Sequence, residues 1–327
     1  MNRAETIARE VYGPGAAVPY AVRLPGGASR ETWALDVVTT GGDRHELVLR
    51  LDGPGAVLEV GAGLAAEARL MRAAADAGVP VPHVVAAADP PADPYILMTR
   101  VPGETIPRRI LRDEAYREAR AGLAAECGRT LAAIHRMPLS CLPATDAETG
   151  AGAEAGAGPG DPLRRWRDVL DLTGEPHPVF ELALRRLAAD RPPAAPTGVV
   201  HGDFRNGNLI VGPEGIRAVL DWELAHAGDP LEDLGWLCVK AWRFGSPLPV
   251  GGFGGYAELI AAYEEAGGRH VDLDALRWWE TFGVLKWGII CVMQTMRHLR
   301  GGAASVELAA LGRRVCQTEW DLLGLLA

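Results

Sequence analysis

A polar loop between two short apolar runs carries the residues best suited to chemistry in this sequence. The runs are residues 199–200 and 209–211, and the loop between them holds His201, Asp203 and Asn208. Polar groups on loops at strand ends are often functional, because the strands position them rigidly. Asp203 suits a base that orients a hydroxyl group.

A second carboxylate, Asp221, follows the next apolar run, residues 216–220. Residues 212–215 (Gly-Pro-Glu-Gly) predict a hairpin turn between the runs. Pairing the two strands would bring Asn208 and Asp221 side by side at the ends remote from the turn. Amide and carboxylate oxygens are ligands for Mg²⁺, and Mg²⁺ carries the phosphates of a nucleotide. The spacing therefore predicts a metal site beside Asp203.

Each of these side chains also has a purely structural interpretation, as a turn or cap residue. The joint spacing of Asp203, Asn208 and Asp221 favours the functional interpretation. His201 is predicted to brace the loop by hydrogen bonds rather than to transfer protons.

Two further carboxylates, Asp229 and Asp233, are predicted to cap and anchor the helix that begins near Pro230, since carboxylates favour a helix N-terminus. For Glu223 the sequence allows two positions: the side chain faces either the metal site or solvent.

The first hundred residues predict a five-stranded antiparallel sheet that would lie over this loop. Three strands fall within residues 22–51, and two more are predicted at 84–88 and 95–99. One helix, residues 64–77, is inserted after the third strand. Residues 100–103 (Arg-Val-Pro-Gly) break the pattern and suit a hinge to a second lobe.

The remainder of the chain is predicted to be mainly helical. A Gly- and Ala-rich segment at about 149–160 interrupts it and is expected to be a flexible loop. The expected helices span residues 113–137, 166–172, 179–189, 230–241, 256–266, 273–300 and 305–325.

The composition is ordinary for a soluble globular protein, with 48% hydrophobic and 23% charged residues. The net charge of −9 argues against a nucleic-acid partner, which needs a basic face. Five scattered cysteines predict reduced thiols and neither a disulfide framework nor a zinc site. With no signal core and no membrane-spanning segment in the sequence, we expect a cytoplasmic monomer or homodimer without a membrane partner.

The loop motifs resemble those of the aminoglycoside phosphotransferase and choline kinase-like family, which are small-molecule relatives of protein kinases. The resemblance rests on His201-Gly202-Asp203…Asn208, on Leu220-Asp221-Trp222-Glu223 and on Gly228-Asp229-Pro230…Asp233-Leu234. The helical tail, residues 278–321, resembles a bacterial subgroup akin to the kinase-like region of acyl-CoA dehydrogenase proteins.

This resemblance implies an α+β fold, the bilobal protein-kinase-like fold. A small antiparallel β N-lobe with one helix, residues 1–100, would bind the nucleotide. A hinge near 99–103 would lead to a larger, mainly helical C-lobe, residues 104–327, for catalysis and acceptor binding.

The resemblance also implies residue roles. Asp203 would accept or orient the proton of the substrate hydroxyl, and Asn208 and Asp221 would bind Mg²⁺. Arg50, at a position where such kinases usually carry Lys, would reach the α- and β-phosphates and pair with Glu67. The other nucleotide-binding residues would be Gly26, Gly27 and Ser29 over the phosphates, and Leu97, Met98, Thr99 and Arg100 at the adenine through backbone groups.

The function so implied is Mg²⁺-dependent transfer of the γ-phosphate of ATP, with GTP left open as donor, to a hydroxyl of a small molecule. The acceptor is either an antibiotic such as an aminoglycoside, a hydroxyacyl compound, or a sugar or amino alcohol. A nucleotide-binding regulator without catalysis is the alternative, motivated by Arg50. A protein kinase is disfavoured, because no Ala-Pro-Glu segment follows Asp221.

Overall fold

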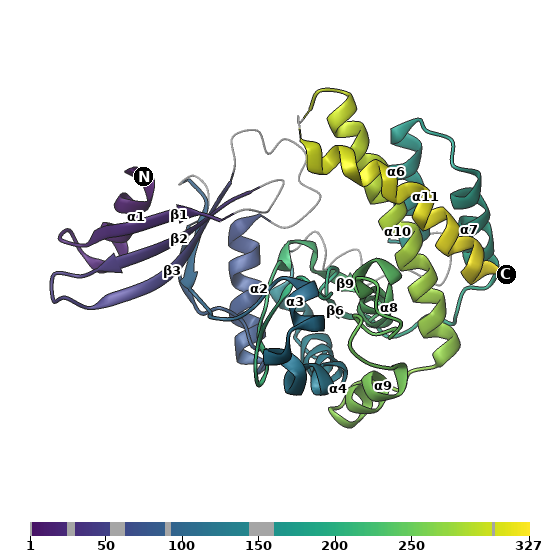
Figure 1. Ribbon diagram of the computed structural model, residues 1–327, viewed down its shortest axis with the longest axis horizontal. Helices are drawn as coiled ribbons and strands as arrows, with labels where there is room; N and C mark the ends of the chain where they lie inside the picture. Colours follow the sequence, from purple (N-terminus) through teal and green to yellow (C-terminus); the bar gives the residue numbers. More distant parts are fainter. Residues whose placement is uncertain (1, 25–29, 53–62, 89–92, 144–159, 303–304) are drawn as a thin grey trace.

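An antiparallel five-stranded sheet forms the N-terminal part of the molecule. The computed structural model describes residues 2–24, 30–52, 63–88, 93–143, 160–302 and 305–327 (Figure 1). The sheet order is β1-β2-β3-β5-β4. Its strands are β1 (Ala17–Arg23), β2 (Arg30–Val38), β3 (Arg44–Asp52), β4 (Val84–Ala88) and β5 (Tyr95–Thr99).

Two helices cover opposite faces of this sheet. Along β5, Leu97 packs in the core made with α1 (Asn2–Tyr12), whereas Ile96 and Met98 pack in the core made with α2 (Leu64–Asp76). This alternation follows from the two-residue period of a strand. Burial on both faces explains why the sequence of β5 is continuously apolar.

The C-terminal part is mainly helical, and it frames two small antiparallel sheets (Figure 1). One sheet pairs β6 (Gly198–Val200) with β9 (His226–Gly228), and the other pairs β7 (Leu209–Gly212) with β8 (Gly215–Val219). The helices are α3 (Pro107–Arg112), α4 (Arg117–His135), α6 (Pro162–Thr173), α7 (Pro178–Ala189), α8 (Leu231–Cys238), α9 (Tyr256–Glu265), α10 (Leu273–Leu299) and α11 (Val306–Leu326).

The link between the two parts is pinned to β7. Glu104 and Val211 exchange backbone hydrogen bonds of 2.9 and 3.0 Å. Gly103 precedes this contact with φ +156°, and a Cβ there would come within 2.5 Å of a side-chain methyl of Ile210. Only glycine allows the hinge segment to approach the strand this closely.

Several predicted bounds and elements need correction. The first strand begins at Ala17 rather than at Val22, and α3 and β9 were not predicted at all. The helix predicted over 230–241 ends at Cys238, because Val239 adopts an extended conformation (ψ 133°), and a 3₁₀ turn, η4 (Lys240–Arg243), follows. The predicted loop at 149–160 lies almost wholly outside the described residues.

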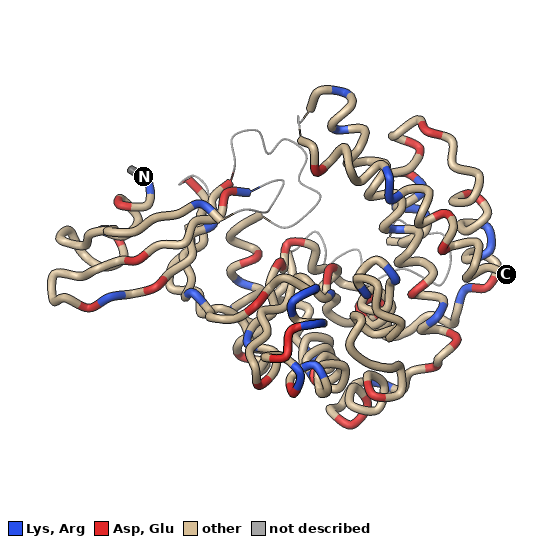
Figure 2. The backbone as a smooth tube through the Cα atoms, viewed as in Figure 1, with Lys and Arg blue, Asp and Glu red and all other residues tan. Residues whose placement is uncertain are grey.

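The two-part architecture agrees with the predicted fold class. Within the described ranges, no helix has both the length and the apolar character needed to cross a bilayer. Figure 2 shows acidic and basic residues interspersed over both parts of the described chain.

Candidate active site

The loop between β6 and β7 is held in place by a buried carboxylate. In the first turn of α8, Asp233 accepts the backbone N–H of His201 (2.7 Å) and that of Gly202 (2.9 Å). Its Oδ2 also contacts Nε2 of His135 at 3.1 Å. Asp233 therefore anchors the loop, whereas Asp229 does cap α8, through the N–H of Leu231.

The electrostatics of Asp233 agree with this anchoring role. Burial alone would raise the pKa of Asp233, but the hydrogen bonds from His135 and the loop outweigh it and lower the pKa. The carboxylate thus stays ionised where two amide N–H groups need an acceptor.

His201 braces the loop from within, as predicted. Its Nδ1 lies 3.2 Å from the backbone nitrogen of Asp203 and accepts that N–H. Nε2 therefore carries the ring proton and donates it to the carbonyl of Leu220 at 3.1 Å. Burial lowers the pKa of His201, which favours this neutral form.

Three donors orient the carboxylate of Asp203. Oδ1 accepts from Nε1 of Trp236 (2.8 Å) and Nε of Arg205 (3.0 Å), and Oδ2 accepts from Nδ2 of Asn208 (2.6 Å). The Asp203 side chain remains 18% exposed. The result is an oriented carboxylate that a bound molecule can still reach.

Asn208 and Asp221 lie at neighbouring ends of the β7–β8 hairpin, as predicted. The register pairs Leu209 with Val219, and the N–H of Leu220 donates to the carbonyl of Asn208 at 2.9 Å. Asp221 itself has φ +60°, a left-handed conformation that is uncommon outside glycine and recurs at functional sites.

The two side chains fit an Mg²⁺ site. The amide nitrogen of Asn208 is committed to Asp203, which leaves its oxygen as a ligand, and the Asp221 side chain is 45% exposed. Mg²⁺ is usually bound by one or two protein groups together with phosphates and water. Among the described residues, no group of three or more His, Cys, Asp or Glu side chains offers another metal site.

A buried charge network joins the N-terminal sheet to this hairpin. Arg50 on β3 forms an ion pair with Glu67 on α2, and its Nη2 also lies 3.3 Å from Oδ1 of Asp221. Arg30 contacts Glu67 at 2.6 Å and Glu223 at 3.2 Å. Glu223 therefore faces the network rather than solvent alone.

Glu67 is the most buried carboxylate of this network. Burial raises the pKa of Glu67, and the charges of Arg50 and Arg30 oppose the rise. Two arginines thus share one buried carboxylate. Sequence motifs had singled out Arg50 but not Arg30, whose position at the start of β2 carries no distinguishing pattern.

The other predicted nucleotide residues are only partly described. Leu97 and Met98 are core residues of β5. The N–H of Thr99 is committed to the carbonyl of His83, and that of Arg100 to the carbonyl of Glu46. The adenine role of this segment stays a prediction, and Gly26, Gly27 and Ser29 lie outside the described residues.

A buried lysine on α10 also holds the loop. Nζ of Lys286 donates to the carbonyl of Gly202 (3.1 Å) and to Oε1 of Glu232 (3.0 Å), and it lies 4.6 Å from the ring centroid of Trp236. Burial alone would raise the pKa of Glu232, but Lys286 and His226 lower it strongly. The loop is therefore held by two helices of the C-terminal part, α8 and α10.

The fold and the loop together define a kinase-like phosphotransferase class. A model of the phosphotransferase enzyme family matches residues 21–279, and the chain belongs to this family. The family and fold that the sequence motifs implied are thereby confirmed.

Individual relatives match only part of this chain, at about 30% identity. Mouse acyl-CoA dehydrogenase family member 10 is 31% identical over 213 residues, which cover 63% of this chain and 19% of the relative. Viomycin phosphotransferase from Streptomyces vinaceus is 30% identical over 184 residues, which cover 52% of this chain and 59% of the relative. This chain thus spans about a fifth of the first relative's length and under two thirds of the second's.

A solved structure supports the fold over the whole chain. A candidate aminoglycoside phosphotransferase from Ralstonia eutropha superposes with a TM-score of 0.72. The match covers 99% of this chain and 97% of the other, at 23% identity. At this identity the likeness establishes the fold.

Proposed function

We propose that this chain is an ATP- and Mg²⁺-dependent phosphotransferase that moves the γ-phosphate to a hydroxyl of a small molecule. The observation that carries the proposal is the carboxylate of Asp203, oriented by three donors and placed beside the paired ends of the hairpin that hold Asn208 and Asp221. The N-lobe, residues 1–100, would hold the nucleotide, and residues 104–327 would provide the catalytic loop and the acceptor site.

In this mechanism Asp203 aligns the acceptor hydroxyl and receives its proton. The acceptor oxygen forms a bond to the γ-phosphorus while the bond to the β–γ bridging oxygen breaks and ADP leaves. Because Trp236 and Arg205 fix Oδ1 of Asp203, the carboxylate needs little reorganisation before it acts.

Asn208 and Asp221 would hold the metal ion, which when bound neutralises charge on the β- and γ-phosphates. The Arg50 side chain would reach the α- and β-phosphates while it keeps its ion pair with Glu67. Arginine can bind phosphate through two parallel N–H groups, which lysine cannot do.

Two acceptor classes fit the family: an antibiotic of the aminoglycoside kind and a hydroxyacyl compound. A nucleotide-binding regulator without catalysis is the second candidate function. Its support is the contact between Arg50 and Asp221, which in a regulator would occupy the metal ligand permanently.

The test is a phosphate-transfer screen with mass-spectrometric detection, using purified chain, Mg²⁺, ATP or GTP, and panels of aminoglycosides, hydroxyacyl compounds and amino alcohols. We expect Asp203→Ala to lower turnover by about 10²–10⁴-fold, the usual contribution of general acid–base assistance, while nucleotide binding persists. Asp43→Ala, which removes an exposed carboxylate from the β2–β3 turn, is the control. Tight nucleotide binding without transfer to any acceptor would favour the regulator, and normal turnover of Asp203→Ala would exclude Asp203 as the base.

A further inference from the structure

Two arginines lie close together on one face of the N-terminal sheet. In the antiparallel register of β2 and β3, Arg30 pairs with Asp52 and Arg50 pairs with Thr32. The two arginines are therefore diagonal neighbours on the same face. Like charges at such a distance repel each other unless a carboxylate lies between them. Glu67, in the first turn of α2, supplies that carboxylate.

Each arginine takes one oxygen of Glu67. Nη1 of Arg30 lies 2.6 Å from Oε2 of Glu67, and Nη1 of Arg50 contacts Oε1. Each arginine also reaches the segment that follows β8. Arg30 contacts Glu223 at 3.2 Å, and Arg50 contacts Asp221 at 3.3 Å. The two arginines thus connect the same buried carboxylate to two nearby carboxylates of the C-terminal part.

The surroundings of the two arginines differ. The Arg30 side chain is 6% exposed, and its Nε also lies 3.5 Å from Oδ1 of Asp52. Arg30 therefore faces three carboxylates inside the protein. The second partner of Arg50, by contrast, is Asp221, whose side chain is 45% exposed. A bound phosphate can replace Asp221 beside Arg50 far more readily than it can reach Arg30.

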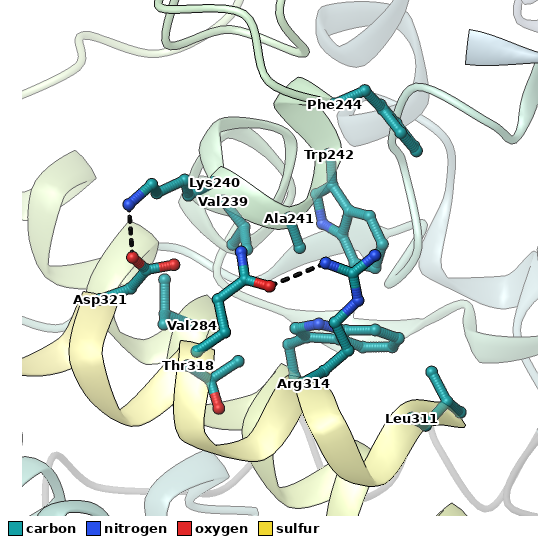
Figure 3. Close-up of a pocket in the computed structure, with 12 residues that line it drawn as sticks. Val239, Lys240, Ala241, Trp242, Phe244, Val284, Leu311, Arg314, Thr318 and Asp321 are labelled. Atoms are coloured by element: carbon teal, nitrogen blue, oxygen red, sulfur yellow. Dashed lines mark hydrogen bonds and ion pairs between the residues drawn. The ribbon is translucent and has the colours of Figure 1, made fainter. Parts of the chain in front are cut away.

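A simpler ion pair in the C-terminal part shows what the second arginine adds. Lys240 contacts Asp321 there, as one cation beside one carboxylate (Figure 3). A ligand that drew on the charge of Lys240 would leave Asp321 poorly compensated, and an uncompensated buried charge is costly. Glu67 is protected from this cost, because Arg30 still compensates it while Arg50 divides its charge between Glu67 and a phosphate.

We infer that Arg30 is a positioning residue for nucleotide binding: it compensates Glu67, so that Arg50 is available to the α- and β-phosphates. This inference rests on the proposed function and deepens it, since it names a residue that controls the phosphate contact without touching the nucleotide. Without the charge of Arg30, Glu67 would hold Arg50 more strongly, and the attraction of Arg50 for phosphate would fall.

The test measures binding to the full chain by calorimetry, with ADP or GDP, whichever the intact chain binds more tightly, and with the matching nucleoside. We expect Arg30→Met to weaken binding of the diphosphate by about tenfold, a typical coupling within one salt-bridge network. The nucleoside, which lacks phosphates, should keep its affinity within about twofold. Lys240→Met, which removes the ion pair with Asp321, is the matched control and should leave both affinities within about twofold.

Two further variants separate this role from a purely structural one. Arg30→Lys keeps the charge and should restore diphosphate binding to within about threefold. Adding Glu67→Gln to Arg30→Met removes the carboxylate that competes for Arg50, so the double variant should bind the diphosphate more tightly than Arg30→Met does. A structural role predicts a further loss instead. Thermal unfolding of each variant checks the fold, and if Arg30→Met does not fold, Arg30→Gln takes its place in the same comparison.

Phosphate-transfer assays distinguish this inference from the proposed function. If diphosphate binding follows the variants as expected but no phosphate reaches any acceptor, Arg30 keeps its role and the proposed phosphotransfer fails. The inference is overturned if Arg30→Met binds the diphosphate as tightly as the intact chain, or if the nucleoside loses as much affinity as the diphosphate. It is also overturned if the double variant binds the diphosphate more weakly than Arg30→Met, or if the intact chain binds neither diphosphate.

Discussion

Replacing Lys286 by Met should destabilise the whole molecule, although the residue lies outside the proposed reaction centre. Its side chain is only 5% exposed, and its ammonium group has two hydrogen-bond acceptors, the Gly202 carbonyl and the Glu232 carboxylate. Removing one partner of a buried ion pair costs about 3–5 kcal/mol, because the other charge is left uncompensated. We expect the low end, about 3 kcal/mol, since His226 still contacts Glu232 at 3.3 Å.

Urea unfolding followed by tryptophan fluorescence measures this loss. A second variant, Lys286→Met with Glu232→Gln, removes both charges and should recover part of the stability, because no unpaired carboxylate then remains. Arg313→Met, which removes an exposed cation from α11, should change the free energy of unfolding by less than about 0.5 kcal/mol.

The pH dependence gives an independent check of the same pair. The folded-state pKa of Glu232 is lowered, so its contribution is present above the ordinary Glu pKa of about 4.3 and is lost as the pH falls below that value. As the pH falls below about 5, the free energy of unfolding of the intact chain should therefore decrease more steeply than that of the double variant. A loss below about 1 kcal/mol for Lys286→Met, or a double variant no more stable than the single one, would refute the reasoning.

Three further substitutions test the site. Trp236→Phe removes one donor to Asp203, and a hydrogen bond to a charged group contributes about 1.5–3 kcal/mol. In steady-state assays this variant should therefore lower kcat about tenfold and leave the KM for ATP unchanged. An equal rise in the KM for ATP would contradict a positioning role for Trp236. Arg50→Ala should raise the KM for ATP by about 10–100-fold by the same estimate, with far-ultraviolet circular dichroism unchanged; an unchanged KM would separate Arg50 from the nucleotide. Gly202→Ala places a Cβ within 2.4 Å of the Leu224 carbonyl at φ +81°, and thermal unfolding should show a loss above about 2 kcal/mol; a fully active and stable variant would show that the loop can move.

Local sequence signals predicted the hairpin and the residues at its ends. The Gly-Pro-Glu-Gly turn determines which strand pairs with which, and this short-range choice places Asn208 beside Asp221. The same holds for β4 and β5, whose apolar runs are bounded by turn residues. These elements needed no knowledge of distant contacts.

One partner of Asp203, Trp236, could not be found in this way. Trp236 reaches it from 33 positions further along the chain, and the contact depends on how α8 packs against the loop. Short elements such as β9 form only because a strand far away in sequence, β6, offers hydrogen-bonding partners. Lys286 did carry a signal: a charge inside an otherwise apolar helix is rarely buried unless it is paired.

The contacts of the loop divide the proposed site into a fixed half and a movable half. Asp233 on α8 and Lys286 on α10 hold the loop from within the C-terminal part, so the orientation of Asp203 does not depend on a nucleotide. Asp221, by contrast, contacts the N-terminal sheet through Arg50. Mg²⁺ would take the place of Arg50 beside Asp221, and the phosphates would take the place of Asp221 beside Arg50. Nucleotide and metal should therefore bind with positive coupling, and Arg50→Lys, which shortens the bridge, should weaken that coupling more than it weakens either ligand alone.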